Sequence, residues 1–301
     1  MAPTPSHPTG GGDGRLLLAV AVNLGLTVVQ VVAGIMAGSL ALIADALHNF
    51  SDAASLIIAI VARRIARRPA HGAMSFGYGR AEPIAALINY TTLVVLSIYL
   101  GAEAIGRFFN PEPVEGWTVV IVAGFALVID AATAALTFAM SKQSMNIRAA
   151  FLHNVADAIG SVAVIVAGIL ILVFGWQMAD PLITLGIAGY VLWLALREMG
   201  GVIRLLMLGS PPGLDPAAVV GALRALPGIT DVHHAHLWQM QEHDAAFDAH
   251  LTIAEGRWQD ADAIKAEAKR TLADVFSIRH TTLEIECANH ACPEPDPFGH
   301  G

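Results

Sequence analysis

The sequence places the same pair of chemically active residue types twice inside an apolar stretch. Residues 47–53 read LHNFSDA and residues 152–158 read LHNVADA, so a histidine precedes an aspartate by four residues in both. Helix positions i and i+4 share one face, so each motif presents one nitrogen and one carboxylate in the same direction. If the two faces meet, they form a pocket with four candidate ligands: His48, Asp52, His153 and Asp157.

The chemistry that such a pocket supports is the binding of a divalent metal. Imidazole nitrogens and carboxylate oxygens in a tetrahedral arrangement suit Zn²⁺, with Co²⁺ and Cd²⁺ as competitors, whereas an all-carboxylate site would suit Mn²⁺. The alternative is that these residues form interhelical hydrogen bonds that lock a helix bundle. Because the motif occurs twice, we favour the metal site. Asp45, three residues before His48, is either an acceptor that orients His48, a packing carboxylate or a proton carrier.

The elements that carry these motifs have the composition of membrane helices. Of the 301 residues, 55% are hydrophobic and 14% are charged, and the mean hydropathy is +0.60, as in an integral membrane protein with some soluble mass. An ionisable side chain at mid-membrane costs about 2.5–3.5 kcal/mol, so four of them need a partner. The sequence predicts an all-α bundle of six transmembrane helices, each about 20 residues or longer, at residues 15–37, 39–62, 83–107, 117–140, 149–175 and 179–205.

The charges that flank these stretches predict their orientation. Arg and Lys residues follow the second stretch, separate the fourth from the fifth and end the sixth, whereas the opposite side has only Arg107. The positive-inside rule therefore places both termini in the cytosol. Residues 1–14 have no positively charged segment before an apolar core, so we interpret them as a disordered cytosolic leader and not as a signal peptide.

A soluble domain is predicted after the last membrane stretch. The segment GSPPGLDP, residues 209–216, ends the helix because proline cannot continue it and glycine permits a sharp exit. Alternating apolar and polar residues in the second strand, where Asp248 and His250 lie on the polar face, predict that one face is buried. The order of elements indicates a small two-layer α/β domain: a helix at about 215–226, strands at 231–240 and 246–254, a helix at about 259–276 and a strand at 281–287.

The negative charge is concentrated in this soluble domain. Up to Pro212, 11 Lys and Arg match 11 Asp and Glu, but from Gly213 onward there are 6 bases, 14 acids and eight of the 12 histidines. Such a surface attracts cations and disfavours nucleic acid as a partner. The two cysteines, Cys287 and Cys292, cannot support a disulfide framework and would stay reduced in the cytosol.

Several stretches resemble the cation diffusion facilitators, in particular the zinc-transporting members related to cobalt-zinc-cadmium resistance. The stretches are SLALIADALHNFSDA at 39–53, FGYGRAEPIAAL at 76–87, SMNIRAAFLHNVADAIGSV at 144–162, and HLW and HTTLEIE in the tail. The resemblance covers about residues 15 to 290. It implies a homodimeric metal/proton antiporter in a bacterial inner membrane, with zinc as substrate, protons as counter-ion and a cytosolic domain similar to a ferredoxin-like metallochaperone. The transport site carries over to His48, Asp52, His153 and Asp157.

The resemblance also implies metal ligands in the cytosolic domain. The first two strands supply two histidines, and the last strand has two glutamates where relatives have a histidine and an aspartate: His233, His250, Glu284 and Glu286. Alternation places His234 and His236 on one face of the first strand, where they could substitute. Solvated surface histidines are the alternative. The segment ECANHAC adds a second, weaker zinc-binding candidate: Cys287, His290 and Cys292.

The sequence departs from the family in the loop after the second helix. Some relatives bind a second metal there through an acid and two histidines, but the corresponding positions here are His71, Met74 and Tyr78. We therefore expect no metal site in this loop. The acidic residue that pairs with the basic residue of this loop in relatives corresponds to Leu208, which leaves Arg80 without that salt bridge.

Taken together, these features predict a divalent metal efflux transporter, a Zn²⁺/H⁺ antiporter that works by alternating access. Residues 15–208 would form the transport domain, 209–290 a cytosolic metal-binding domain in which zinc is also a regulatory ligand, and 291–301 a flexible tail. Two other classes stay open, an intramembrane metalloenzyme and a membrane-anchored metal sensor. The enzyme is less favoured because the sequence has no HExxH motif and four protein ligands leave no position for a catalytic water.

Overall fold

The computed structural model describes residues 12–141, 145–241, 244–292 and 296–298, so most of the predicted leader lies outside the described residues. Only the backbone is described for residues 12–23, 52, 56, 59, 136, 137, 139–141, 145–154 and 241. The chain divides into two compact units, one of residues 1–60 and 88–198 and the other of residues 61–87 and 199–301.

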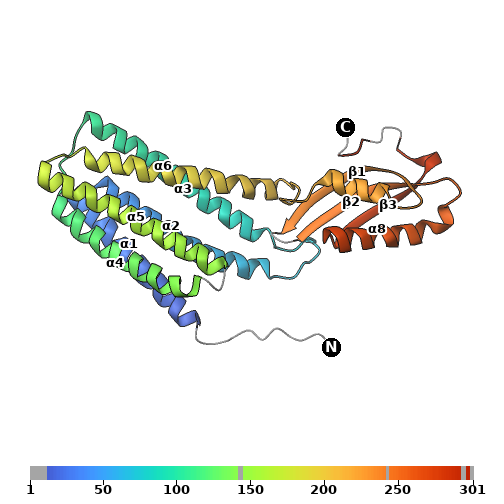
Figure 1. The fold of residues 1–301 in the computed structure, drawn as a ribbon, viewed down its shortest axis with the longest axis horizontal. Coiled ribbons are helices and arrows are strands. Elements are labelled where there is room, and N and C mark those ends of the chain that lie inside the picture. Colours follow the sequence, from blue (N-terminus) through green and yellow to red (C-terminus); the bar gives the residue numbers. More distant parts are fainter. Residues whose placement is uncertain (1–11, 142–144, 242–243, 293–295, 299–301) are drawn as a thin grey trace. The chain divides into compact units, whose positions relative to one another are not determined.

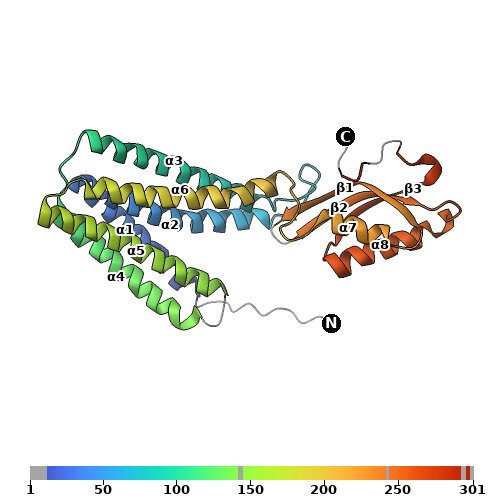
Figure 2. The same ribbon diagram turned by 45° about the horizontal axis from the view of Figure 1, so that its top comes forward.

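Among the described residues, six long helices precede the sheet in the chain (Figures 1 and 2). They are α1 (Gly12–Ala37), α2 (Leu40–Ala66), α3 (Ala81–Phe109), α4 (Gly116–Ser141), α5 (Met145–Phe174) and α6 (Ala179–Leu206). Among the described residues, α2 to α6 contain spans long and apolar enough to cross a membrane, whereas α1 contributes a shorter apolar run, Leu24–Ala37. The helices lie where hydropathy predicted them. Six membrane crossings stay a prediction.

Glycines let α4 and α5 pack closely. A Cβ atom on Gly116 would lie 2.8 Å from the carbonyl oxygen of Gly168, and a Cβ atom on Gly168 would lie 2.7 Å from Cγ2 of Val120. Buried small side chains, Ala123 and Val164 among them, continue this contact. In lipid, where apolar burial between helices brings little gain, such close van der Waals packing holds the helices together. The contact positions α5, which carries the second histidine–aspartate motif.

A buried aspartate on α6 holds the N-terminus of α2. The fully buried Asp180 accepts hydrogen bonds from the Ser39 hydroxyl at 2.5 Å and from the Leu40 backbone N–H at 2.9 Å. The first N–H groups of a helix have no partner within the helix, so this carboxylate satisfies them. Arg107 on α3 lies 3.7 Å from the same carboxylate and compensates its charge. The first motif on α2 is thereby fixed along the helix axis.

The C-terminal sheet has three strands in the described residues. The elements are α7 (Pro216–Arg224), β1 (Ile229–Gln241), β2 (Asp244–Ile253), the short 3₁₀ helix η1 (Trp258–Asp260), α8 (Ala261–Phe276), β3 (His280–Cys287) and a second 3₁₀ helix, η2 (Ala288–His290). The strand order is β1-β2-β3, with β1 antiparallel and β3 parallel to β2. The predicted α-β-β-α-β order is confirmed, but the more specific ferredoxin-like arrangement is not.

The two faces of the sheet differ as the alternation predicted. Phe247 and Leu251 on β2 are fully buried in a core with residues of α7 and α8, and Figure 2 shows α8 along one side of the strands. Asp248 and His250 point to the opposite face and are half-buried. The polar face is therefore free to carry chemistry while the apolar face holds the domain together.

Loss of the Asp180 carboxylate should destabilise the helical unit. In Asp180→Ala the Ser39 hydroxyl, the N–H groups at the start of α2 and the guanidinium of Arg107 lose their buried acceptor, and breaking a buried ion pair in this way costs about 3–5 kcal/mol. We expect the Tm of the purified protein in detergent to fall well below that of Glu112→Ala. That control removes the largely exposed carboxylate that pairs with Arg107 at 3.0 Å. Equal Tm values for the two variants would contradict this role of Asp180.

Candidate metal centre

The structure brings one residue from each histidine–aspartate motif into contact. Nε2 of His48 on α2 lies 3.2 Å from Oδ1 of Asp157 on α5, although the two residues are 109 positions apart in the chain. Their side chains are 15% and 10% exposed. An imidazole and a carboxylate this close, with little access to water, form half of the ligand set that the sequence predicted.

The other two predicted ligands are placed by their backbones alone. Asp52 lies one helical turn after His48 on α2, and His153 lies one turn before Asp157 on α5. Their side chains are outside the described part of the structure. Because the i and i+4 positions share a helix face, each backbone sits on the face whose other member takes part in the His48–Asp157 contact.

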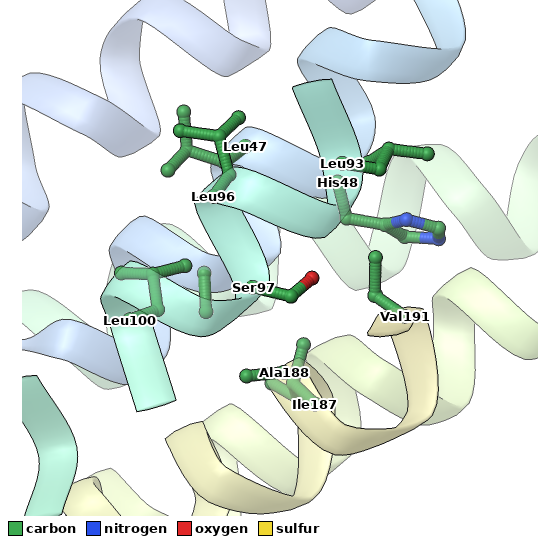
Figure 3. Close-up of a pocket in the computed structure, with 10 residues that line it drawn as sticks. Leu47, His48, Leu93, Leu96, Ser97, Leu100, Ile187, Ala188 and Val191 are labelled. Atoms are coloured by element: carbon green, nitrogen blue, oxygen red, sulfur yellow. The ribbon is translucent and has the colours of Figure 1, made fainter. Parts of the chain in front are cut away.

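His48 also borders a small apolar cavity on the side of α3 and α6 (Figure 3). The cavity has a volume of about 10 Å³, and its only polar lining side chains are His48 and Ser97. Figure 3 shows the imidazole beside Leu93 and Val191. A space of this size holds about one water molecule at most. The apolar wall keeps bulk water away from this side of the imidazole and strengthens its electrostatic contacts.

Asp45 is held by a hydrogen-bonded network that extends from α1 to the neighbour of His48. The Gln30 amide donates to Asp45 Oδ2 at 2.7 Å, and the Asn49 amide donates to the Gln30 carbonyl oxygen at 3.3 Å. All three side chains are buried. A Cβ atom on Gly160 would lie 3.4 Å from Asp45 Oδ1, so this carboxylate borders α5. The contact with Gln30 was not anticipated from the sequence, where the first interpretation of Asp45 was an acceptor for His48.

On the sheet, the four predicted cytosolic ligands lie together on the polar face. His233 pairs in register with His250, and His250 pairs in register with Glu284, so the three residues form one row across the strands. Nδ1 of His250 lies 2.8 Å from Glu286 Oε1, and its Nε2 lies 3.4 Å from Glu284 Oε2. Nε2 of His233 lies 3.2 Å from Glu286 Oε2. Such a set of nitrogens and oxygens is able to hold a divalent cation.

The prediction that His234 and His236 would share a face of the first strand agrees with the structure, which places both beside residues of the polar face. A register irregularity between His233 and His236 and a positive φ of 49° at His234 mark a bulge in β1. As a result His233 lies on this face as well, with its ring centroid 5.1 Å from that of His234, while His236 lies 3.3 Å from Asp248. Strict alternation would have placed His233 and His234 on opposite faces, so the sequence pattern did not predict their contact.

The structure separates the residues of the second candidate in the tail. Cys287 Sγ lies 2.9 Å from His290 Nδ1, but Cys292 Sγ lies 3.7 Å from His250 Nδ1 and 3.5 Å from Glu286 Oε1. Cys292 therefore joins the ligands on the sheet. The sequence could not indicate this, because the contact depends on how the chain turns after β3.

The carboxylates beside Cys292 affect its ionisation. Burial raises the pKa of the Cys292 thiol, and hydrogen bonding and charge repulsion from Glu286 raise it further, together with the charge of Glu284. Burial also raises the pKa of the Glu286 carboxyl, but hydrogen bonds from Cys292 and interactions with His233 and His250 outweigh that effect and lower it. At neutral pH the metal-free site thus has an ionised Glu286 next to a protonated thiol.

In the loop after α2, the described side chains are not arranged as metal ligands. Nε2 of His71 lies 2.9 Å from the Tyr78 hydroxyl oxygen, and the backbones of His71 and Met74 hydrogen-bond to each other in both directions. A phenol keeps its proton at neutral pH, with a pKa of about 10, and a thioether is a weak ligand for zinc. The absence of a metal site in this loop stays a prediction.

Both parts of the chain are similar to known proteins. A model of the cation efflux transmembrane domain matches residues 16–207, and a model of the cation efflux protein cytoplasmic domain matches residues 211–288. The zinc transporter ZitB of Shigella flexneri is 36% identical over 296 residues, which are 97% of this chain and 93% of that protein.

Two further relatives have names that indicate transport of metal cations. The cadmium, cobalt and zinc/H(+)-K(+) antiporter of Bacillus velezensis is 33% identical, with 96% of this chain and 93% of that protein covered. The metal cation efflux system protein CzcD of Cupriavidus metallidurans is also 33% identical, with 98% and 92% covered. A solved structure, the metal-bound C-terminal domain of the CzcD transporter, is 29% identical over 24% of this chain and 99% of its own, and its TM-score of 0.23 carries no structural argument.

Proposed function

Because this chain belongs to the cation efflux family, we propose that His48, Asp52, His153 and Asp157 form the site through which it exports zinc. The family and the names of its full-length relatives identify the chain as an integral membrane transporter for divalent metals, not an enzyme. Zinc appears in the names of both ZitB and the Bacillus velezensis antiporter. The residues that carry the metal and the proton exchange belong to the proposal.

The contact between His48 and Asp157 is the observation that supports this site. It joins α2 to α5 at 3.2 Å and involves one residue of each motif. Asp52 and His153 occupy the partner positions of the same helix faces. One imidazole and one carboxylate from each helix would give a tetrahedral N₂O₂ set, which suits Zn²⁺ and admits Cd²⁺ and Co²⁺.

The ligand types account for exchange with protons. Imidazole and carboxylate bind metal only when deprotonated, so a site open to the cytosol releases any protons as zinc enters. Histidine titrates near pH 6.5, so on the more acidic outer side protons compete with zinc for the same atoms and displace it. The protonated site then returns to the cytosolic side. Alternating access of one site thus couples proton entry to metal exit.

The remaining features of the proposal concern assembly and placement. We place both termini on the cytosolic side of a bacterial inner membrane, with six crossings per subunit, because basic residues flank the helices on that side. The match to the cytoplasmic domain of cation efflux proteins supports a homodimer held through a metallochaperone-like domain. Zinc on the polar face of this domain would act as a regulatory ligand. Residues 15–208 would form the transport domain, and 209–290 the cytosolic domain.

A metal sensor that binds zinc without moving it is the remaining competitor. Zinc uptake into proteoliposomes under an imposed pH gradient separates the two, since a sensor binds zinc and gives no flux. We expect the flux to follow the pH gradient and to collapse when a protonophore removes it. Flux that is indifferent to the gradient would contradict proton exchange.

Removal of one ligand from the membrane site should abolish transport. Even residues that only orient metal ligands typically contribute about 10–100-fold to affinity, so Asp157→Ala should weaken zinc binding by at least about 100-fold and stop uptake. Glu115→Gln is a suitable control, because it changes an exposed acid at the start of α4. Wild-type flux from Asp157→Ala in a correctly folded protein would refute the site assignment.

Exchange of a nitrogen ligand for oxygen should change the order of preferred metals. His48→Asp leaves one imidazole and three carboxylates, and oxygen ligands suit harder or larger ions better than zinc. We expect manganese or cadmium to gain on zinc in competition for uptake. A ranking of zinc, cadmium, cobalt and manganese that is identical to wild type would show that His48 does not contact the metal.

The loop after α2 should be dispensable for zinc. We expect His71→Ala to retain nearly full uptake and the wild-type amount of bound zinc per subunit, because Tyr78 and Met74 do not complete a site with it. His153→Ala, in contrast, should lose one zinc per subunit and the uptake together. Elemental analysis of the purified variants measures the zinc bound per subunit. A zinc ion lost in His71→Ala alone would show that the loop binds metal.

A further inference from the structure

A compact group of four side chains lies on the polar face of the sheet, and we name it the tail cluster: His233, His234, His250 and Cys292. Each offers one ligand atom, and these four atoms all lie within 4.8 Å of one another. The three imidazole rings form a triangle with centroid separations of 5.1, 5.1 and 5.4 Å. Two members, His234 and Cys292, do not belong to the ligand set that family resemblance suggested.

The bulge in β1 creates this triangle. In a regular strand neighbouring side chains point to opposite faces, so His233 and His234 would be separated by the sheet. The backbone of His234 adopts the left-handed region, with φ of 49°, which costs most non-glycine residues some strain, although histidine tolerates it better than most. Strain of this kind is maintained by its surroundings, and here it brings both imidazoles to the same side.

The C-terminal tail supplies the surroundings that hold the bulge. The His234 N–H donates to the Asp296 carbonyl oxygen at 2.9 Å, and the Ala235 N–H donates to the Pro297 carbonyl oxygen at 3.0 Å. Ala235 also forms a parallel bridge with Phe298. Residues 296–298 were expected to be part of a flexible tail, yet they lie along β1 at the point of the bulge. The same tail carries Cys292.

The buried histidine of the cluster lacks well-directed hydrogen bonds. His233 is fully buried, and neither of its ring nitrogens makes a hydrogen bond, although each lies 3.2 Å from a carboxylate oxygen. A neutral imidazole has one nitrogen with a free lone pair, which faces a carboxylate unfavourably. Buried polar atoms without a hydrogen bond point to a missing partner. A cation bound to His233 Nε2 would accept the lone pair of that nitrogen and would also compensate the negative charge of Glu286.

The separations between sulfur and nitrogen fit a tetrahedral metal site. Zn–S bonds of about 2.3 Å and Zn–N bonds of about 2.0–2.1 Å at the tetrahedral angle place sulfur about 3.6 Å from nitrogen. Cys292 Sγ lies 3.7 Å from Nδ1 of His250 and 3.9 Å from Nδ1 of His234. Small shifts of side chains would complete such a site. We propose that the tail cluster is a His₃Cys site that binds zinc or the more thiophilic cadmium and ties the C-terminal tail to the sheet.

This site goes beyond transport and differs in chemistry from the glutamate set beside it. His250, Glu284 and Glu286 also lie close enough together to hold a cation, and both sets use His250. Its Nδ1 lies near both Glu286 and Cys292. A metal bound to that nitrogen would therefore take either the carboxylate oxygen or the sulfur as its next ligand. Thiolate is the preferred ligand of soft metals. Cadmium and zinc should therefore take the sulfur set, and harder ions the glutamates.

A cobalt titration of the full-length protein in detergent tests the sulfur ligand directly. Cobalt bound to thiolate gives an intense charge-transfer absorption in the near ultraviolet, and the proposed membrane ligands contain no sulfur. We expect this absorption in wild type and in Cys287→Ser, and its loss in Cys292→Ser. Absence of the band in wild type, or its loss in Cys287→Ser with retention in Cys292→Ser, would overturn the proposal. Neither result bears on zinc transport, which depends on other residues.

Paired histidine variants test the bulge and do not require substitution of the cysteine. His234→Ala should reduce cadmium affinity at this site at least tenfold, measured by competition with a chelator. His236→Ala, two residues further on β1 and beside Asp248, should leave the affinity within twofold of wild type. Equal affinities for the two variants would show that His234 is not a ligand. The far-ultraviolet circular dichroism of each variant confirms that the sheet is intact.

Discussion

The pairing of ionisable groups inside an apolar helix bundle is the constraint on which this structure depends. His48 and Asp157 are each costly to place at mid-membrane, and each reduces that cost by lying 3.2 Å from the other. The contact works only if α2 and α5 keep their relative height and rotation. Two separate interactions keep the helices in these positions. Asp180 fixes the start of α2 against α6, and the Gly116–Gly168 contact lets α5 pack closely on α4.

The same constraint explains the polar residues that surround the site. Asp45, Gln30 and Asn49 are buried, and each forms a hydrogen bond with another member of the group. A network with every member satisfied makes the bundle rigid, whereas a single unsatisfied carboxylate would cost several kcal/mol in a low-dielectric interior. The network ends at Asn49, the neighbour of His48 in sequence, so it ties this part of α2 to α1. The apolar cavity beside His48 completes the enclosure.

The two proposed metal sites differ in the ligand chemistry that their proposed tasks require. A transport site must release its metal in every cycle, and imidazole and carboxylate allow this because protons compete for them near neutral pH. A thiolate would hold zinc too firmly for rapid exchange with protons. The cytosolic tail cluster has no such restriction, so a sulfur ligand there suits retention of metal. Cys292 lies on a segment that returns to β1, so metal bound to it also restrains the chain terminus.

Local features of the sequence determined much of this protein. Six apolar stretches, the repeated spacing of histidine and aspartate, and the alternation in β2 predicted the helices, the candidate ligands and the polar face of the sheet, because periodicity and hydropathy depend on neighbouring residues alone. The same motifs indicated the family, which the matches over both domains confirm.

Only the tertiary structure decided which side chains meet. The bulge that turns His234 toward His233, the return of the tail that brings Cys292 to His250, and the hold of Asp180 on α2 each join residues far apart in the chain or reverse a local pattern. The alternation of β1 would separate His233 from His234, but one extra residue at the bulge brings both to the polar face. Such contacts follow from backbone geometry and packing across the whole domain, which spacing along the sequence does not specify.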